Sequence, residues 1–242
     1  MGIGLASLML TAACIVSRPS GIVCREGGAE MVVVIHGLNR TSRAMERMAK
    51  ALAQEGYTVL NCNYPSHKES VATLAEGLYQ QIAPRIAKAE RVHFVTHSMG
   101  GIVLRKMAQE HPLENMGRVV MLSPPNQGSE MVDALGAWRA YQWVNGPAGN
   151  ELGTSPDSTP FQLGAPAFPI GVIAGDRTVN PLFSWMIPGP DDGKVAVERT
   201  KVEGMDDFLC LHVTHTWMMR NPHVIRQTAH FLKTGHFETA VR

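Results

Sequence analysis

Three features that would indicate other classes of protein are missing from this chain of 242 residues. Its charges nearly cancel, at 22 Lys and Arg against 21 Asp and Glu, and no basic run is longer than a pair, so the electrostatic signature of a nucleic-acid-binding protein is absent. Its four cysteines form no CxxC pair and lack metal-like spacing, which argues against a structural zinc site. No internal repeat or linker divides the sequence. A single domain is therefore expected, long enough to bury a large core without disulfides or metals.

The chain also has few long apolar runs, and the most prominent is at residues 1–16, MGIGLASLMLTAACIV. This run is typical of a signal-peptide core and is short for a membrane-spanning helix, which needs about 20 residues. LTAAC, ending at Cys14, resembles a bacterial lipoprotein cleavage site, although no Lys or Arg precedes it. We expect residues 1–24 to be a signal-like, lipoprotein-like or disordered segment that brings the protein near a membrane. The cell envelope or secretion is favoured over a cytoplasmic location, with a ragged N-terminus of a cytosolic enzyme as the alternative.

What is present from Glu30 onward is an alternation of β-branched runs with segments of helical period. This alternation predicts parallel strands joined by crossover helices. The expected strands are MVVVIHG, YTVLNC, RVHFVT, GRVVML, IGVIAG and DFLCLHV. Helices are expected around 45–52, 71–82, 99–110 and 221–233. The predicted fold is α/β, a three-layer sandwich in which helices flank a mostly parallel central sheet, with residues 25–242 as one domain. Cys62 and Cys210 lie in these apolar runs and are expected to be buried free thiols.

The alternation lapses over residues 124–169, which are rich in Gly, Pro, Ser and Asn. A structureless loop of that length is unusual in a compact domain, so we expect short helices or a cover over a binding site. Trp138, Tyr141 and Trp143 in this region would either line an acyl or alcohol pocket or pack within the cover.

Ser98 stands where a strand breaks sharply into a helix, in the sequence THSMGG. Such an elbow lifts a serine hydroxyl from the sheet edge and directs the next backbone N–H, at the helix N-terminus, toward developing negative charge. Gly100 fits the fifth position of the G-x-S-x-G pattern. Thr96 departs from the pattern, because the first position must be small where strand and helix pass closely. A plain glycine-rich turn is the alternative interpretation.

Three segments resemble the α/β-hydrolases, in particular small bacterial serine lipases and esterases. They are VVVIHGLNR at residues 32–40, THSMGG at 96–101 and VTHTWMM at 213–219, and the resemblance extends over about residues 30 to 233. It implies an α/β-hydrolase fold with Ser98 as nucleophile. It also implies that the backbone N–H groups of Leu38 and Met99 form an oxyanion hole.

The resemblance places the catalytic base on a loop after the last strand and the acid between serine and histidine along the chain. His215 follows the run FLCLHV and is preferred to His212, which lies within it. For the acid, Asp192 is preferred because DGKV resembles the acid-bearing Asp-x-x-Val segment of small lipases. Asp176, directly after a predicted strand, is the second candidate, and Asp191 neighbours the first.

The predicted activity is hydrolysis of carboxylic esters through an acyl-enzyme on Ser98, with small-molecule or lipid esters as substrates and with no metal or organic cofactor. The same acyl-enzyme would also serve an acyltransferase. A non-catalytic binding protein that keeps the scaffold is a further alternative. The sequence leaves the oligomeric state open.

Overall fold

The structure is a computed structural model that describes residues 22–23, 30–179 and 184–238. Its strands are β1 (Ile22–Val23), β2 (Glu30–Ile35), β3 (Thr58–Cys62), β4 (Arg91–His97), β5 (Met116–Leu122), β6 (Ile170–Gly175) and β7 (Asp207–Leu211). Its helices are η1 (Ser42–Met45), α1 (Glu46–Gln54), α2 (Val71–Ile86), α3 (Met99–Glu110), α4 (Glu130–Leu135), α5 (Arg139–Asn150), α6 (Thr159–Gln162), α8 (Val197–Thr200), η2 (Met218–Arg220) and α9 (Pro222–Thr234).

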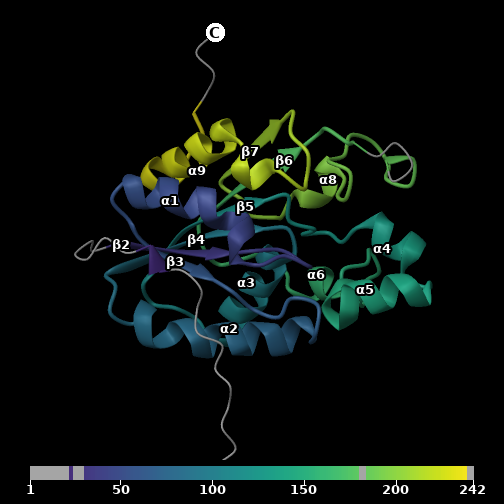
Figure 1. The fold of residues 1–242 in the computed structure, drawn as a ribbon, viewed down its shortest axis with the longest axis horizontal. Helices are drawn as coiled ribbons and strands as arrows, with labels where there is room; N and C mark the ends of the chain where they lie inside the picture. The colour runs from purple at the N-terminus through teal and green to yellow at the C-terminus, as the bar shows by residue number, and fades with distance from the viewer. Residues whose placement is uncertain (1–21, 24–29, 180–183, 239–242) are drawn as a thin grey trace, which may run out of the picture.

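The strands form one sheet in the order β1-β3-β2-β4-β5-β6-β7 (Figure 1). The strands β2 to β7 run parallel, and β1 pairs antiparallel with β3 at one edge. In the centre, Ile35 of β2 pairs with Thr96 of β4, and His97 pairs with Leu122 of β5. The loops that follow the parallel strands therefore meet at one edge of the sheet. The predicted α/β class is confirmed.

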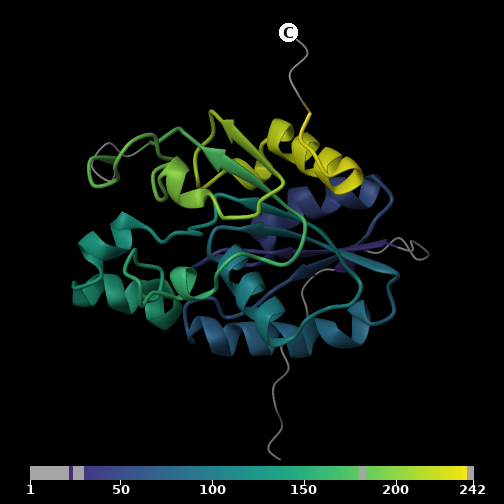
Figure 2. The same ribbon diagram turned by 180° about the vertical axis from the view of Figure 1, so that it is seen from behind.

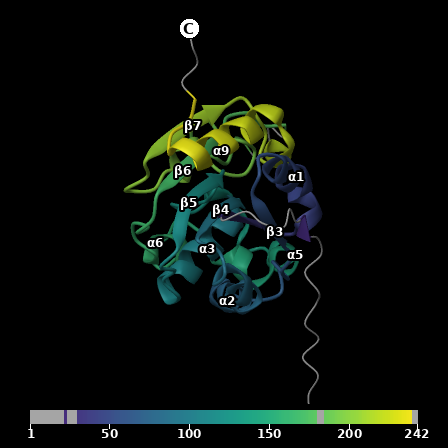
Figure 3. The same cartoon turned by 90° about the vertical axis from the view of Figure 1, so that its left-hand side faces the viewer.

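Helices cover both faces of the sheet, with α1 and α9 on one side and α2 and α3 on the other (Figures 1 and 3). Alternate residues of β2 serve the two cores, because successive side chains of a strand point to opposite faces. Val32 and Val34 pack with the α1 and α9 residues, whereas Val33 and Ile35 pack with those of α2 and α3. The unbroken apolar run of β2 is explained by this burial on both faces.

The region 124–169 contains α4, α5 and α6, which gather beyond the carboxyl ends of the strands (Figure 2). α5 is kinked at Gly146, whose φ is 64°. A Cβ at this position would lie 1.7 Å from the backbone oxygen of His67, so only glycine permits this approach of the cover to the loop after β3. The Ala148 N–H also donates to the Glu69 carbonyl at 3.1 Å. The cover is thus held against the loop that precedes α2.

Two features of the fold differ from the sequence analysis. β1 was not anticipated and lies within the N-terminal segment that was expected to stand apart from the domain. Cys210 is exposed, and its predicted burial is wrong, because β7 is the edge strand and its residues are only partly covered; Cys62 is buried as expected. Cys14, Cys24 and the lipoprotein-like sequence lie outside the described residues. Within the described ranges, no helix is both long and apolar enough to cross a bilayer.

Candidate active site

Ser98 occupies the turn between the end of β4 and the first residue of α3. Its φ of 54° and ψ of −129° lie in a region that non-glycine residues rarely adopt. Such a conformation costs on the order of 1–3 kcal/mol and persists only where the surrounding structure enforces it. Here the Ser98 N–H donates to the Leu122 carbonyl at 2.8 Å, and its carbonyl accepts from the Gly101 N–H at 2.9 Å. The predicted strand-to-helix elbow is present.

Glycines of α3, rather than a small residue at position 96, provide the close approach of helix and sheet. A Cβ on Gly100 would lie 2.7 Å from the His36 carbonyl oxygen, and one on Gly101 would lie 3.2 Å from Thr96 Oγ1. Thr96 is fully buried, and its hydroxyl has no hydrogen-bond partner among the described residues. The elbow therefore accommodates threonine sterically but leaves its hydroxyl unsatisfied.

The structure brings Ser98, His215 and Asp192 into one hydrogen-bonded chain. Ser98 Oγ lies 2.9 Å from His215 Nε2, and His215 Nδ1 lies 2.7 Å from Asp192 Oδ2. His215 and Asp192 are almost fully buried, at 4% and 2% exposure. The Asp192 carboxylate fixes the tautomer, because it can only accept a hydrogen bond: the imidazole proton therefore stays on Nδ1, and Nε2 is left to accept from the serine hydroxyl.

The turn around Asp192 holds the carboxylate in position. Asp192 Oδ1 accepts from the backbone N–H groups of Lys194 and Val195, at 3.0 Å each, and the Asp192 carbonyl accepts from the His215 N–H at 3.0 Å. The neighbouring Asp191 is turned away from the histidine. Its Oδ1 accepts from the Gly193 N–H at 2.7 Å, so it stabilises the turn.

The two alternative candidates pair with each other. Asp176 Oδ1 lies 2.9 Å from His212 Nδ1, and both side chains are solvent-exposed, at 38% and 75%. No hydrogen bond joins either of them to Ser98 in the described part of the chain. This geometry is that of a surface ion pair, which contributes little to stability.

The loop after β2 lies directly against the elbow. A Cβ on Gly37 would be 3.0 Å from Ser98 Cβ, and Leu38 borders the same cavity as Ser98. Asn39, with a φ of 54°, donates from its amide to the Val144 carbonyl at 3.1 Å. The loop is thus tied to α5 in the cover. The N–H of Met99, as the first residue of α3, has no partner within its own helix. The sequence analysis missed Asn39, for which no local signal existed.

His36 stabilises the loop after β2 through its contacts with Tyr64 and Gly37. Its ring stacks on Tyr64 with centroids 4.3 Å apart, and the Tyr64 hydroxyl donates to the His36 carbonyl at 2.6 Å. The Tyr64 N–H donates to His36 Nε2 at 3.3 Å, so the proton of the neutral ring is on Nδ1, which donates to the Gly37 carbonyl at 2.9 Å. Burial lowers the pKa of His36 to about 4. The ring is therefore neutral near physiological pH.

His97 hydrogen-bonds to the backbone of the histidine loop rather than to the serine. Its Nε2 lies 3.0 Å from the His215 carbonyl and must donate, because a carbonyl only accepts. Burial, reinforced by the nearby His215, holds the pKa of His97 well below its usual value. A neutral His97 therefore anchors the backbone of the histidine loop.

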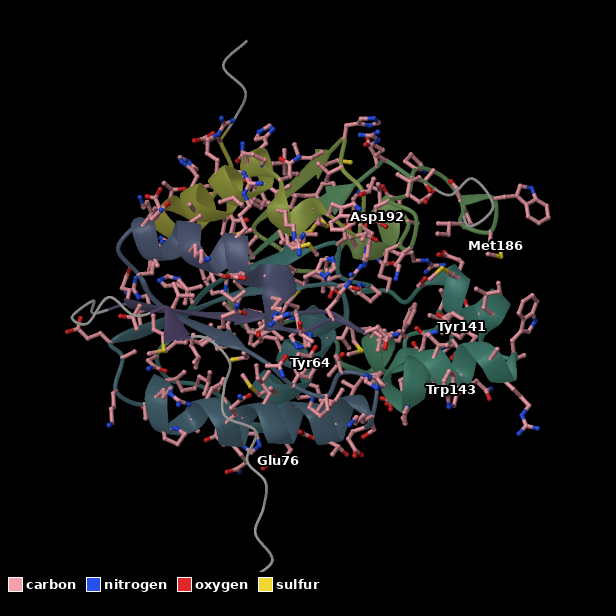
Figure 4. The ribbon with its side chains drawn as sticks, viewed as in Figure 1. Tyr64, Glu76, Tyr141, Trp143, Met186 and Asp192 are labelled. Carbon is pink, nitrogen blue, oxygen red and sulfur yellow. The ribbon has the colours of Figure 1, made fainter. Side chains whose placement is uncertain are left out.

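A cavity of about 60 Å³ opens beside the serine. Its lining residues are Leu38, Arg40, His97, Ser98, Pro125, Ser129, Met131, Val132, Tyr141, Asn145, Gly149, Leu152, Lys194, Val195 and His215. In Figure 4, Tyr141 lies on α5 in the cover, and Asp192 lies in the turn that precedes α8. Trp138 and Trp143 neither line the cavity nor pack within the cover, since they are 65% and 85% exposed. Both alternatives foreseen for them are wrong, because they lie on the outward face of the cover.

No cluster of three or more His, Cys, Asp or Glu side chains among residues 22–23, 30–179 and 184–238 has the arrangement of a metal site. The cavity residues instead supply a hydroxyl, an imidazole, backbone donors and apolar walls.

The sheet order, the helices on both faces and the elbow define the α/β-hydrolase fold. Residues 32–232 match the alpha/beta hydrolase family, and the chain belongs to that family.

Individual relatives are distant. The chain is similar to the lysosomal thioesterase PPT2 of Mus musculus, with 24% identity over 219 residues that cover 78% of this chain and 72% of that protein. Among solved structures, the lipase BlEst2 of Bacillus licheniformis aligns with a TM-score of 0.65 and 18% identity, covering 90% of this chain and 96% of that one. The phospholipase PlaB of Legionella pneumophila aligns with a TM-score of 0.66 and 18% identity, covering 83% of this chain and 56% of that one. At these identities the structures show the fold alone.

Proposed function

We propose that this protein is a serine hydrolase of carboxylic esters that works through an acyl-enzyme on Ser98. The observation that carries the proposal is the chain of two short contacts from Ser98 Oγ to His215 Nε2 and from His215 Nδ1 to Asp192 Oδ2. A serine hydroxyl alone is a poor nucleophile at neutral pH, and a histidine oriented by a buried carboxylate supplies the base that it needs.

The first half of the reaction forms the acyl-enzyme. Ser98 Oγ attacks the ester carbonyl carbon while its proton passes to His215 Nε2. The backbone N–H groups of Leu38 and Met99 stabilise the resulting oxyanion, each contributing on the order of 100- to 1,000-fold in turnover. His215 then gives its proton to the leaving alkoxide oxygen, and the carbon–oxygen bond breaks.

The second half restores the enzyme. A water molecule donates a proton to His215 Nε2 and attacks the acyl carbon, and the tetrahedral species collapses as Ser98 regains its proton. Asp192 stays ionised throughout and stabilises the imidazolium. The Ser98 elbow keeps the hydroxyl and the Met99 N–H on the same side of the substrate, which spares the entropy of assembling them during the reaction.

The size of the cavity favours small acyl or alcohol groups. Its volume of about 60 Å³ is well below the roughly 300–1,000 Å³ of pockets that enclose drug-sized ligands. Its apolar walls include Met131, Val132 and Leu152, which suit a short alkyl chain. We therefore expect butyryl esters to be better substrates than long-chain esters.

A second candidate is hydrolysis of thioesters, and the similarity to thioesterase PPT2 over 78% of the chain favours it. The same residues perform both reactions, because a thiolate leaves from the same tetrahedral intermediate. Butyryl-N-acetylcysteamine and p-nitrophenyl butyrate share an acyl group, and their kcat/KM values rank the two activities. Adding a competing alcohol or amine and analysing the products reports any acyl transfer.

The decisive experiment is labelling with a fluorophosphonate probe, which reacts covalently with an activated serine. We expect the wild type to be labelled, Ser98→Ala to remain unlabelled, and His215→Ala to be labelled much more slowly. His212→Ala is the matched control, because among the described residues this histidine pairs with the exposed Asp176 and not with Ser98, and it should be labelled at the wild-type rate. An unlabelled wild type, as expected of a non-catalytic binding protein, or a labelled Ser98→Ala variant would overturn the proposal.

A further inference from the structure

Two cationic side chains border the cavity that contains Ser98 and His215. Arg40 belongs to the loop after β2, and Lys194 belongs to the turn that holds Asp192. They are 154 positions apart in the chain, so only the tertiary fold brings them together. Lys194 is a solvent-exposed residue, and partial burial, followed by the positive charge of Arg40, lowers its pKa, which Asp192 offsets only in part. Both cations also lower the pKa of His97, although less than burial and the nearby His215 do.

No carboxylate neutralises this pair in the part of the chain that the structure describes. Neither Arg40 nor Lys194 takes part in an ion pair with a described residue. Asp192 is already committed, with one oxygen on His215 and the other on two backbone N–H groups. Asp191 accepts from the Gly193 N–H and from the Ser184 hydroxyl. Two like charges are thus held beside the nucleophile without a protein counter-charge, an arrangement that an anionic ligand relieves.

Part of the cavity wall is apolar. Val132 and Leu152 are buried members of the main hydrophobic core, and Tyr141 packs against it. These residues come from the cover, whereas Arg40 and Lys194 come from the loops that carry the oxyanion donor and the acid. The cavity therefore has an apolar wall that suits an acyl chain and a cationic wall that suits a charged group of the alcohol.

We propose that the natural substrate is an ester of a short acyl chain with a phosphate-bearing alcohol, whose phosphate binds Arg40 and Lys194. This inference rests on the proposed function of Ser98. A guanidinium presents paired N–H donors that match phosphate oxygens, and a lysine ammonium adds a point charge. The chemistry is unchanged: the bond from the acyl carbon to the alcohol oxygen breaks, that oxygen takes its proton from His215, and the products are a carboxylic acid and an alcohol phosphate.

The test compares two soluble substrates with the same scissile bond, monobutyrylglycerol and butyryl-glycerol phosphate. For the wild type at low salt, we expect the phosphate ester to have a KM about 10-fold lower, since one or two charge-assisted hydrogen bonds are gained. Arg40→Met and Lys194→Met should each raise the KM for the phosphate ester several-fold and leave that for the neutral ester within about twofold. Arg40→Lys should retain part of the preference. Added salt should weaken it through screening.

Lys88→Met is the matched control, because Lys88 is an exposed cation in the loop that leads into β4, at the opposite edge of the sheet from Ser98. It should leave both KM values unchanged. Equal KM values for the two esters in the wild type, or equal effects of Arg40→Met on both, would refute the phosphate assignment. That outcome is distinct from failure of the proposed function, in which Ser98→Ala would still cleave both esters.

Discussion

Replacing Asp192 by asparagine should leave the shape of the site intact and reverse the tautomer of His215. The environment of Asp192 dictates which way the new amide faces. Oδ1 accepts from two backbone N–H groups at 3.0 Å, so the asparagine oxygen must stay there to avoid placing donor against donor. The NH₂ group then faces His215 Nδ1, where the carboxylate oxygen stood at 2.7 Å. His215 must carry its proton on Nε2, and a protonated Nε2 cannot accept the proton of Ser98.

The expected loss of kcat is large, because in almost every molecule of the variant His215 is in the tautomer that cannot act as the base. An aspartate-to-asparagine change that enforces the wrong tautomer in a serine triad lowers kcat by about 10⁴-fold, which corresponds to about 5 kcal/mol of transition-state stabilisation. Steady-state hydrolysis of p-nitrophenyl butyrate measures the effect. KM should change little, since Asp192 is buried behind the histidine and is not among the residues that line the cavity.

Asp176→Asn provides the matched control. Asp176 carries the same functional group and also contacts a histidine, but both members of that pair are exposed to solvent. Its replacement should leave kcat within about twofold of the wild type. Retention of more than about a tenth of the activity by Asp192→Asn, or an equal loss in Asp176→Asn, would refute the tautomer argument.

Two further predictions concern stability. Thr96→Val keeps the shape of the side chain and removes a buried hydroxyl without a described partner, so it should raise the free energy of unfolding by about 1 kcal/mol in urea titrations. Because the pKa of His36 is about 4 in the folded protein and about 6.5 in the unfolded chain, the unfolded state alone binds a proton between these values. Lowering the pH from about 6.5 to about 4 should therefore cost up to about 3 kcal/mol of stability through His36.

Each of these two stability predictions has a control variant within the chain. Thr228 is also fully buried, but its hydroxyl donates to the Val224 carbonyl at 2.8 Å, so Thr228→Val should destabilise the protein where Thr96→Val does not. Destabilisation by both would contradict the assignment of an unsatisfied hydroxyl to Thr96. His36→Gln should be less stable at neutral pH and lose stability less steeply in acid, with His97 retaining its own share of the slope. Parallel pH profiles for wild type and His36→Gln would speak against the argument.

Much of the fold followed from local patterns in the sequence. The periods of apolar residues predicted the six parallel strands and the helices between them, since a strand buried on both faces has to be continuously apolar. β1 was missed because two residues carry no period. The burial of Cys210 was wrong because the same apolar run is compatible with a central or an edge strand, and only the order of the strands distinguishes them.

For the site, the elbow motif marked Ser98 as a candidate, and the resemblance to the α/β-hydrolases, which place their base on a loop after the last strand, marked His215. For the acid, the sequence favoured Asp192 and kept Asp176 as the second candidate. The folded chain adds what local sequence does not contain: Asp192 contacts His215, whereas Asp176 pairs with His212 at the surface. The sequence also did not predict that Arg40 and Lys194 line the same cavity. The path of a loop between strands depends on packing and hydrogen bonds with distant segments rather than on its own residues.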